Sequence, residues 1–290
     1  MAPSSPIVVL DSGLGGLTVV RALRGALPGE QILYFGDTAR LPYGNKTAAT
    51  VTNFVHQIIS YLLPQNPKHV VIACNTATAL ALPAIRCTFP TLPISGVIEP
   101  GARAAVAAAG AKQLPTIGII ATEATVRSRA YERAIGRRRQ WARIVQQSAP
   151  LLVPIIEEGR SGNDPLVRLA LKQYLTPLVR QGIDVLVLGC THYPILKDTI
   201  AQLVGPQIRV IDSAEQCAQD VAQRLRARGL LRDAQDSSGQ LASFVTDDPG
   251  RFKRLAGRFL GHEIDLPTWV SPDELYRERQ GGPVPVSIPA

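Results

Sequence analysis

The feature that most constrains the fold is an alternation of short apolar runs and longer amphipathic segments along most of the chain. Each apolar run is rich in Val, Ile and Leu, and each ends in glycine or small polar residues. The segments between the runs carry apolar residues at helical spacing, which is typical of strand–loop–helix units. A chain that alternates in this way forms parallel sheets with right-handed crossovers. Strands are predicted at 7–10, 31–35, 69–73, 94–97, 116–120, 142–146, 184–188, 208–211 and 243–246.

The helical segments and the chain length together predict two domains. Helices are expected at 17–27, 47–63, 76–85, 101–109, 126–135, 165–180 and 214–228, and a further one follows Asp248 and Pro249, an N-cap and a first-turn proline. A chain of 290 residues suits two α/β domains better than one core. The predicted fold class is therefore α/β, with two similar doubly wound parallel-sheet domains.

Reactive side chains gather where the expected strands end, and parallel sheets bind ligands beyond those ends. Cys74 and Cys190 occupy similar contexts, each after an apolar run and before a helix start. A thiolate is a suitable base, and a helix N-terminus lowers the usual thiol pKa of about 8.5. The sequence offers no persuasive Schiff-base lysine. Two thiols on opposite faces of one carbon would remove and return its proton, which predicts a racemase without a cofactor. Cys87 and Cys217 are expected to be packing residues.

Other polar residues at the strand ends are candidate assistants for the thiols. Asp11 and His192 are placed to relay or orient protons, and Asp37 and Glu157 are further candidates. Structural roles remain open: a helix N-cap for Asp11, a turn aspartate for Asp37 and a turn histidine for His192. The loop 12–16 lacks the spacing of a dinucleotide or Walker motif, so its backbone N–H groups are more suited to a carboxylate.

Charge and ligand counts argue against several other functions. The formal net charge is +8, and arginines crowd the segment 127–143, which is interpreted as a solvated helical face because no nucleic-acid motif accompanies it. Cys190 and His192 supply only two metal ligands, so no metal is expected. No apolar run is long enough to span a bilayer, and the N-terminus lacks signal-peptide features, so a cytoplasmic location is expected.

Four stretches together resemble the glutamate racemase family of the aspartate/glutamate racemases. They lie at 10–18, 34–44, 73–77 and 188–194, in the family's order and spacing. The resemblance implies cofactor-independent interconversion of L-glutamate and D-glutamate, which feeds bacterial peptidoglycan synthesis. It also implies two α/β domains that face a central cleft. In this scheme 1–98 and 212–270 form the first domain, 99–211 the second, and 271–290 a mobile proline-rich tail.

The resemblance also implies residue roles. Cys74 would act on the D-enantiomer with help from Asp11, and Cys190 would act on the L-enantiomer with help from His192. Asp37 and Glu157 match auxiliary acidic positions. The positions that match substrate-holding residues are Asp11, Ser12, Tyr43, Gly44, Asn75, Thr76, Thr122, Thr191 and His192.

Three alternatives remain open. Aspartate racemase shares the two-thiol logic, but its second cysteine is typically followed by Thr-Glu, whereas Thr191 and His192 favour glutamate. A binding protein would act through the basic surface, for example on DNA gyrase. A cysteine hydrolase would use Cys190 and His192, which are very close along the chain for such a dyad. The expected partner is glutamate, with a homodimer left open; nucleic acid and membranes are not expected partners.

Overall fold

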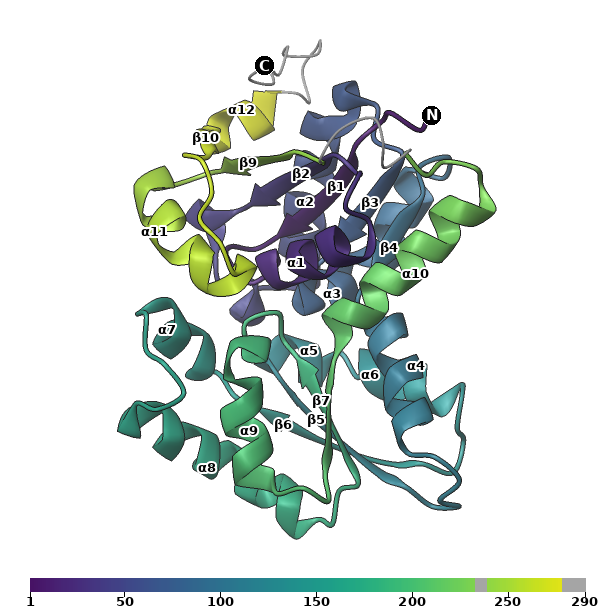
Figure 1. The fold of residues 1–290 in the computed structure, drawn as a ribbon, viewed down its shortest axis with the longest axis vertical. Coiled ribbons are helices and arrows are strands. Elements are labelled where there is room, and N and C mark those ends of the chain that lie inside the picture. The colour runs from purple at the N-terminus through teal and green to yellow at the C-terminus, as the bar shows by residue number, and fades with distance from the viewer. Residues whose placement is uncertain (233–238, 278–290) are drawn as a thin grey trace.

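Two parallel sheets, one above the other in Figure 1, form the framework of the molecule. The structure is a computed structural model that describes residues 1–232 and 239–277. In these residues the first sheet has the strand order β10–β9–β2–β1–β3–β4, and the second has the order β6–β5–β7–β8. All strand pairs are parallel, which confirms the predicted α/β class with two doubly wound parallel-sheet domains.

The first sheet is buried on both faces because helices cover each side. Its central strand has no exposed residue, and successive side chains face opposite clusters. Ile7 and Val9 join the cluster under α1, α10 and α11, whereas Val8 and Leu10 join the cluster under α2, α3 and α12. The strands are β1 (Ile7–Asp11), β2 (Ile32–Gly36), β3 (His69–Ile72), β4 (Ile94–Gly96), β9 (Leu241–Val245) and β10 (Thr268–Trp269). The helices are α1 (Leu17–Ala26), α2 (Ala48–Leu62), α3 (Asn75–Thr88), α10 (Ser213–Ala227), α11 (Pro249–Leu260) and α12 (Pro272–Arg277).

The second sheet follows the same plan. Ile117 and Ile119 face the cluster beneath α4 and α6, whereas Leu186 and Leu188 face α8 and α9. The strands are β5 (Thr116–Ala121), β6 (Arg143–Ser148), β7 (Val185–Gly189) and β8 (Arg209–Asp212). The helices are α4 (Ile98–Ala108), α5 (Glu123–Arg127), α6 (Ala130–Gly136), α7 (Leu152–Glu157), α8 (Pro165–Arg180) and α9 (Lys197–Val204). Short 3-10 turns are η1 (Thr38–Arg40), η2 (Tyr43–Asn45), η3 (Leu63–Gln65) and η4 (Tyr193–Leu196).

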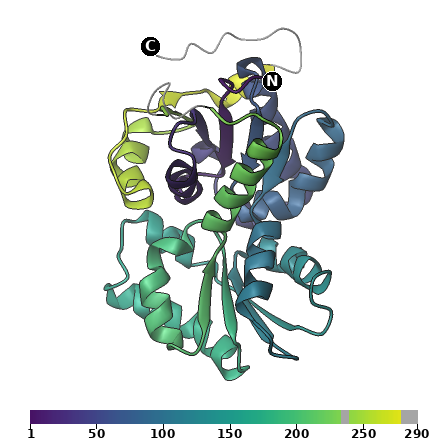
Figure 2. The same cartoon turned by 45° about the vertical axis from the view of Figure 1, so that its right-hand side comes forward.

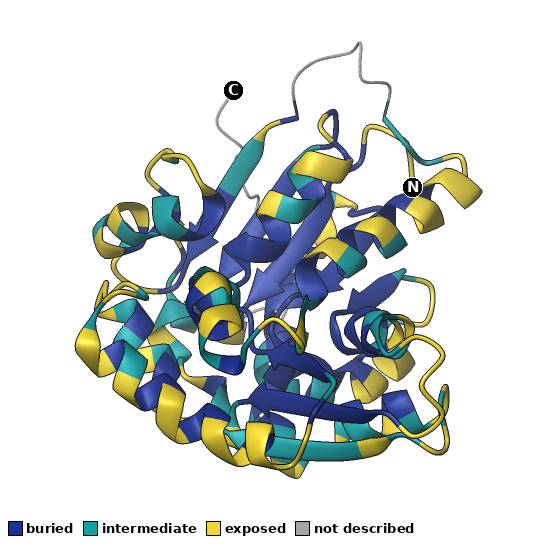
Figure 3. Cartoon of the chain, turned by 60° about the horizontal axis from the view of Figure 1, so that its bottom comes forward, coloured by how far each residue is buried: buried dark blue, intermediate teal, exposed yellow. Residues whose placement is uncertain are grey.

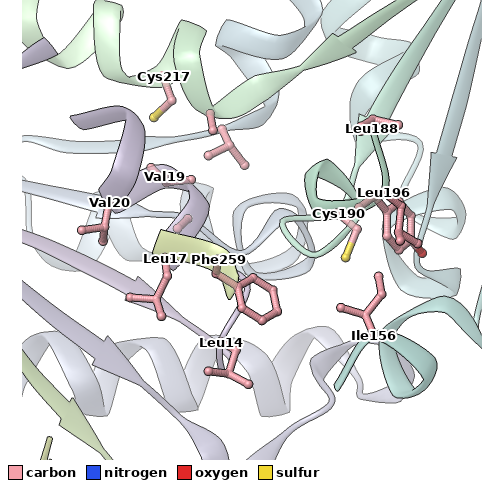
Figure 4. Close-up of a cluster of buried hydrophobic side chains, with 14 of the residues drawn as sticks. Leu14, Leu17, Val19, Val20, Ile156, Leu188, Cys190, Leu196, Cys217 and Phe259 are labelled. Carbon is pink, nitrogen blue, oxygen red and sulfur yellow. The ribbon is translucent and has the colours of Figure 1, made fainter. Parts of the chain in front are cut away.

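The chain crosses between the sheets and its C-terminal part returns to the first. Figure 2 shows α10 running from the second sheet to the first, where it lies beside α1. The inner strands β1, β2, β3, β5 and β7 are buried, whereas β6, β8 and β10 are partly or fully exposed. The outer helix faces are exposed, as Figure 3 shows. One buried cluster includes Leu14 and Leu17 near the first sheet and Ile156 and Leu196 near the second, so the sheets share a core (Figure 4). The boundaries at 98/99 and 211/212 stay predictions.

Two predicted segments differ from the structure. The single helix expected at 126–135 is two helices, α5 and α6, because Arg129 adopts a left-handed backbone conformation with φ 53°. The predicted mobile tail began at 271, but α12 forms at its start and buries Leu275 in the first domain's core. An apolar anchor therefore holds that part, and the rest of the predicted tail, 278–290, lies outside the described residues.

Candidate active site

Loops at the carboxyl ends of strands from both sheets line one narrow cavity. The loops follow β1, β2 and β3 in the first sheet and β5 and β7 in the second, and α7 contributes Val153. The cavity volume is about 30 Å³, far below the ~300–1,000 Å³ of typical ligand sites. Access for a ligand therefore requires the cavity walls to move apart. The lining residues are Ser12, Pro42, Tyr43, Gly44, Cys74, Asn75, Thr76, Thr122, Val153, Cys190, Thr191 and His192.

Cys74 is the N-cap of α3, as its position between a strand and a helix predicts. Its sulfur accepts a hydrogen bond from the backbone N–H of Ala77 at 3.5 Å. The expected lowering of its pKa is wrong for this structure. Burial, aided by the negative charge of Asp11, raises the pKa of Cys74 to about 12, against hydrogen bonds from Ala77 and Ser12. Desolvation therefore outweighs the helix N-terminus, and Cys74 holds its proton at neutral pH.

Cys190, His192 and Glu157 form a connected chain on the opposite side. His192 Nδ1 lies 3.8 Å from the sulfur of Cys190, and Nε2 lies 2.9 Å from Oε1 of Glu157. Burial disfavours a charged imidazole, but the hydrogen bonds to Cys190 and Glu157 outweigh it and raise the pKa of His192 to about 10. The imidazolium therefore persists at neutral pH and stabilises negative charge on the adjacent sulfur.

Asp11 lies behind the cavity wall and links the two sheets. Its carboxylate accepts hydrogen bonds from the backbone N–H of Gly13 at 2.9 Å and from the hydroxyl of Thr191 at 3.3 Å. Burial raises the pKa of Asp11, although the positive charge of His192 and the backbone N–H groups oppose the rise. The charge of Asp11 thus interacts with Cys74 on one side of the cavity and with His192, beside Cys190, on the other.

Hydroxyl and amide groups line the same cavity as the two cysteines. The hydroxyl of Thr76 lies 2.8 Å from that of Thr122, and Thr125 lies within hydrogen-bond distance of both. Tyr131 donates to Oδ1 of Asn75 at 2.8 Å. Nδ2 of Asn75 is buried and has no hydrogen-bond partner among the described residues. An unpaired buried donor at a cavity wall is suited to an anionic ligand group.

Two glycines allow the first-sheet loops to approach the second sheet. A Cβ atom at Gly15 would lie 2.5 Å from Nδ1 of His192. A Cβ atom at Gly44 would lie 3.0 Å from the Cβ of Thr122. The contact at Gly15 is too short unless His192 shifts, so closure of the site needs glycine there, whereas the contact at Gly44 is tight and would need Thr122 to move slightly.

Asp37 does not line the cavity. It is fully buried and accepts hydrogen bonds from the guanidinium of Arg40, from Thr246 at 2.9 Å and from the hydroxyl of Tyr43. Because Tyr43 lines the cavity, Asp37 can act only through it. Glu157 likewise touches the site through His192. The lining residue Val153 and the supporting residues Thr125 and Tyr131 were not singled out from the sequence, because no local motif marks them.

Most arginine side chains of the segment 127–143 are paired with carboxylate or carbonyl groups of the same chain. Arg137 and Arg138 both contact Glu99, and Arg129 pairs with Glu132. Arg139 donates to backbone carbonyl groups at Gly110 and Lys112. These contacts agree with a solvated helical face and do not favour a nucleic-acid interface.

Metal ligands and membrane-crossing helices were also sought within residues 1–232 and 239–277. No group of three or more His, Cys, Asp or Glu side chains there could hold a metal ion. No helix in the same ranges has the length and apolar character that a bilayer crossing needs.

Comparison with known proteins points to one group of enzymes. Residues 17–221 match the model of the Asp/Glu/Hydantoin racemase family. The glutamate racemase of Geobacter metallireducens is 45% identical over 262 residues, which cover 90% of this chain and 95% of that protein. The crystal structure of the Thermus thermophilus glutamate racemase in complex with β-chloro-D-alanine is similar with a TM-score of 0.83 and 42% identity, covering 94% of this chain and 100% of the other. The Francisella tularensis glutamate racemase in complex with D-glutamate has a TM-score of 0.85 and 36% identity, covering 94% and 99%.

Proposed function

The chain belongs to the Asp/Glu/Hydantoin racemase family, in its glutamate racemase branch, and we propose that it interconverts L-glutamate and D-glutamate by a two-cysteine mechanism. The observation that carries the mechanism is that Cys74 and Cys190, which follow strands of different sheets, line the same cavity. Inversion at a carbon requires one group to remove the proton and another to return a proton on the opposite face. The two thiols satisfy this requirement without a cofactor.

In the direction from L to D, Cys190 acts as the base. With the imidazolium of His192 beside its sulfur, it takes the α-proton of L-glutamate as a thiolate. The electron pair of the broken C–H bond is delocalised into the α-carboxylate. The thiol of Cys74 then gives its proton to the opposite face, which yields D-glutamate, a Cys190 thiol and a Cys74 thiolate. Proton exchange restores the starting state, and the steps run in reverse from D-glutamate.

The cavity provides electrostatic support for the developing negative charge. Its lining contains no lysine or arginine among the described residues. Backbone N–H groups at the start of α3, the unpaired amide of Asn75 and the hydroxyls of Thr76 and Thr122 are the available donors, and helix N-termini favour anions. We place the α-carboxylate against these donors. The imidazolium of His192 supplies positive charge on the other side.

Glutamate is proposed as the substrate over aspartate because His192 follows Thr191, and because the relative that holds D-glutamate has 36% identity over most of the chain. The biological role proposed is the supply of D-glutamate for peptidoglycan in the cytoplasm. Incubation of purified, pyridoxal-free protein with L-glutamate and with L-aspartate, followed by circular dichroism, tests the choice. Faster loss of the aspartate signal would reverse it.

Single serine variants test the two-base assignment. Cys74→Ser and Cys190→Ser are each expected to lower racemisation by about 10²–10⁴-fold, the usual contribution of a positioned acid or base. Cys87→Ser is the matched control because Cys87 is an exposed thiol and not the packing residue expected from the sequence. Full activity in either of the first two variants would rule out the assignment.

Proton exchange in deuterated water gives a sharper result. Cys74→Ser retains the base for L-glutamate, so NMR should show α-proton exchange of L-glutamate with retention and little exchange of D-glutamate. Cys190→Ser should show the opposite preference. The same preference in both variants would contradict the assignment of each cysteine to one enantiomer.

A further inference from the structure

Helix α11 belongs to the first domain but reaches the acid–base groups of the second. Its buried residues Phe252, Ala256, Phe259 and Leu260 form one apolar stripe along the helix. At the N-terminal end of this stripe, the ring of Phe252 lies 6.0 Å from the ring of Tyr34 on β2. The helix is therefore anchored on the first sheet, and its C-terminal half extends towards α7.

Arg258 holds the C-terminal end of α7 from this anchored helix. Its guanidinium donates from Nη1 to the carbonyl oxygen of Ile156 at 3.0 Å and from Nη2 to that of Arg160 at 2.7 Å. These two carbonyl groups lie on either side of Glu157 and of the turn at Gly159, where φ is 84°. The carbonyl oxygen of Ile156 also accepts from the backbone N–H of Gly159 at 3.0 Å, and a planar guanidinium can bind two carbonyl groups at once.

Phe259, the next residue on α11, contacts the imidazole of His192. The two rings meet edge to face, with centroids 5.5 Å apart and planes at 88°. Figure 4 shows the Phe259 ring between Leu14 and Leu17 on one side and Ile156 and Cys190 on the other. One turn of α11 thus contacts the ring of His192 and the carbonyl groups on either side of Glu157.

We propose that Arg258 and Phe259 are positioning residues that set the geometry of the Glu157–His192 pair and thereby the proton transfer at Cys190. Arg258 fixes the backbone that carries Glu157, and Phe259 fixes the plane of the His192 ring. The inference rests on the proposed two-cysteine function. Neither side chain lines the cavity, so neither acts on the substrate directly.

The length of α7 explains why an external clamp is needed. This helix has six residues, and helices so short are marginal without tertiary contacts. Glu157 is its last residue, where helix ends fray. Arg251 of α11 reaches the carbonyl oxygen of Glu157 only at 3.5 Å, so without Arg258 the turn that carries this carboxylate would be held less firmly.

The expected effect is specific to one of the two proton transfers. Enantiomers have equal free energies, so kcat/KM must fall equally in both directions. Kinetic isotope effects on kcat/KM separate the steps. If transfer at Cys190 becomes slower, α-deuterated L-glutamate shows a larger isotope effect, because its C–D bond breaks in that step. α-Deuterated D-glutamate shows a smaller one, because transfer at Cys74 then limits the rate less.

Arg258→Gln is the principal variant, and Arg254→Gln is its matched control. Arg254 is an exposed arginine one turn earlier on α11, so its replacement removes the same charge. Arg258→Gln is expected to lower kcat/KM about tenfold, the equivalent of about 1.4 kcal/mol, with the L isotope effect raised and the D isotope effect lowered. Phe259→Leu should change both isotope effects in the same directions, and Arg254→Gln should change neither.

The outcomes distinguish the inference from the function on which it rests. A wild-type protein without racemase activity, or a fully active Cys190→Ser variant, would overturn the proposed function. If the wild type is active but Arg258→Gln leaves both isotope effects unchanged, the inference alone is overturned. This holds even if the rate falls, because a partly unfolded sample lowers the rate without altering isotope effects. If Arg258→Gln does not fold, Arg258→Lys, which keeps the charge but not the planar fork, is measured by the same criterion.

Discussion

Replacement of Glu157 with Gln tests the electrostatics of the Cys190 side most directly. The change removes one negative charge and retains a side chain of the same shape with an acceptor oxygen. Glu157 lies 2.9 Å from Nε2 of His192, and the exposed fractions of the two side chains are 10% and 4%. Solvent screening of this pair is therefore weak, and the loss of charge should be felt by the imidazole.

The magnitude follows from the difference between a charged and a neutral acceptor. A hydrogen bond to a charged group contributes about 1.5–3 kcal/mol, and one between neutral groups about 0.5–1.5 kcal/mol. The difference of about 1–1.5 kcal/mol corresponds to about one pKa unit. The other polar groups near His192 are Cys190 and Asp11, and Phe259 adds an apolar ring. These remain in the variant, so the pKa of His192 should fall by about one unit from about 10.

The assay is kcat/KM for L-glutamate between about pH 7 and 11, because this parameter reports the free enzyme. A histidine with a raised pKa keeps its proton until the pH approaches that raised value. The imidazolium that supports the Cys190 thiolate is thus present below about pH 10 in the wild type and is lost as the pH rises further. In Glu157→Gln the alkaline decline should begin about one pH unit lower. The amino group of free glutamate titrates identically for both proteins.

Glu158→Gln is the control because it removes the same charge from the exposed neighbouring residue. Its profile should match that of the wild type. An unchanged alkaline decline in Glu157→Gln, or an equal shift in both variants, would refute the assignment of Glu157 as the partner that keeps His192 charged.

Two further predictions concern closure and stability. Gly15→Ala should lower activity by about 10²-fold or more while the protein stays folded, because the added Cβ would displace His192. Small misplacements of catalytic groups have costs of this size. Gly25→Ala is the control: its added Cβ would have no atom within 4 Å, so activity should be unchanged. Lys68→Met should lower the free energy of unfolding in urea by about 3–5 kcal/mol because it removes the cation that pairs with the buried Glu30 carboxylate. The double variant with Glu30→Gln should recover much of this loss, and an equal loss in both would contradict the reasoning.

Strand positions could be predicted from the sequence because parallel strands covered on both faces are continuous apolar runs. The runs at 7–10 and 184–188 correspond to β1 and β7, each within a residue or two. The predicted strand at 69–73 likewise corresponds to β3 and places Cys74 directly before α3. These positions depend on local composition and turn residues, which the sequence carries.

Short elements could not be predicted in the same way. α7 has no strong apolar period of its own, and its end is held by Arg258 from α11. The break between α5 and α6 arises at Arg129, whose left-handed conformation is not indicated by its residue type. β10 has two residues and exists through pairing with β9. In each case contacts distant in sequence decide the structure.

The sequence by itself determined which reactive groups stand at the carboxyl ends of the strands, and therefore that Cys74 and Cys190 belong to two matching loops. Only the tertiary structure decided what surrounds each thiol. Burial beside Asp11 raises the pKa of Cys74, opposite to the expectation from its helix N-terminus. Glu157, 35 residues before His192, supplies the charge on the other side. The physical reason is that desolvation and Coulomb interactions depend on distances between separate elements, and sequence spacing does not specify those distances.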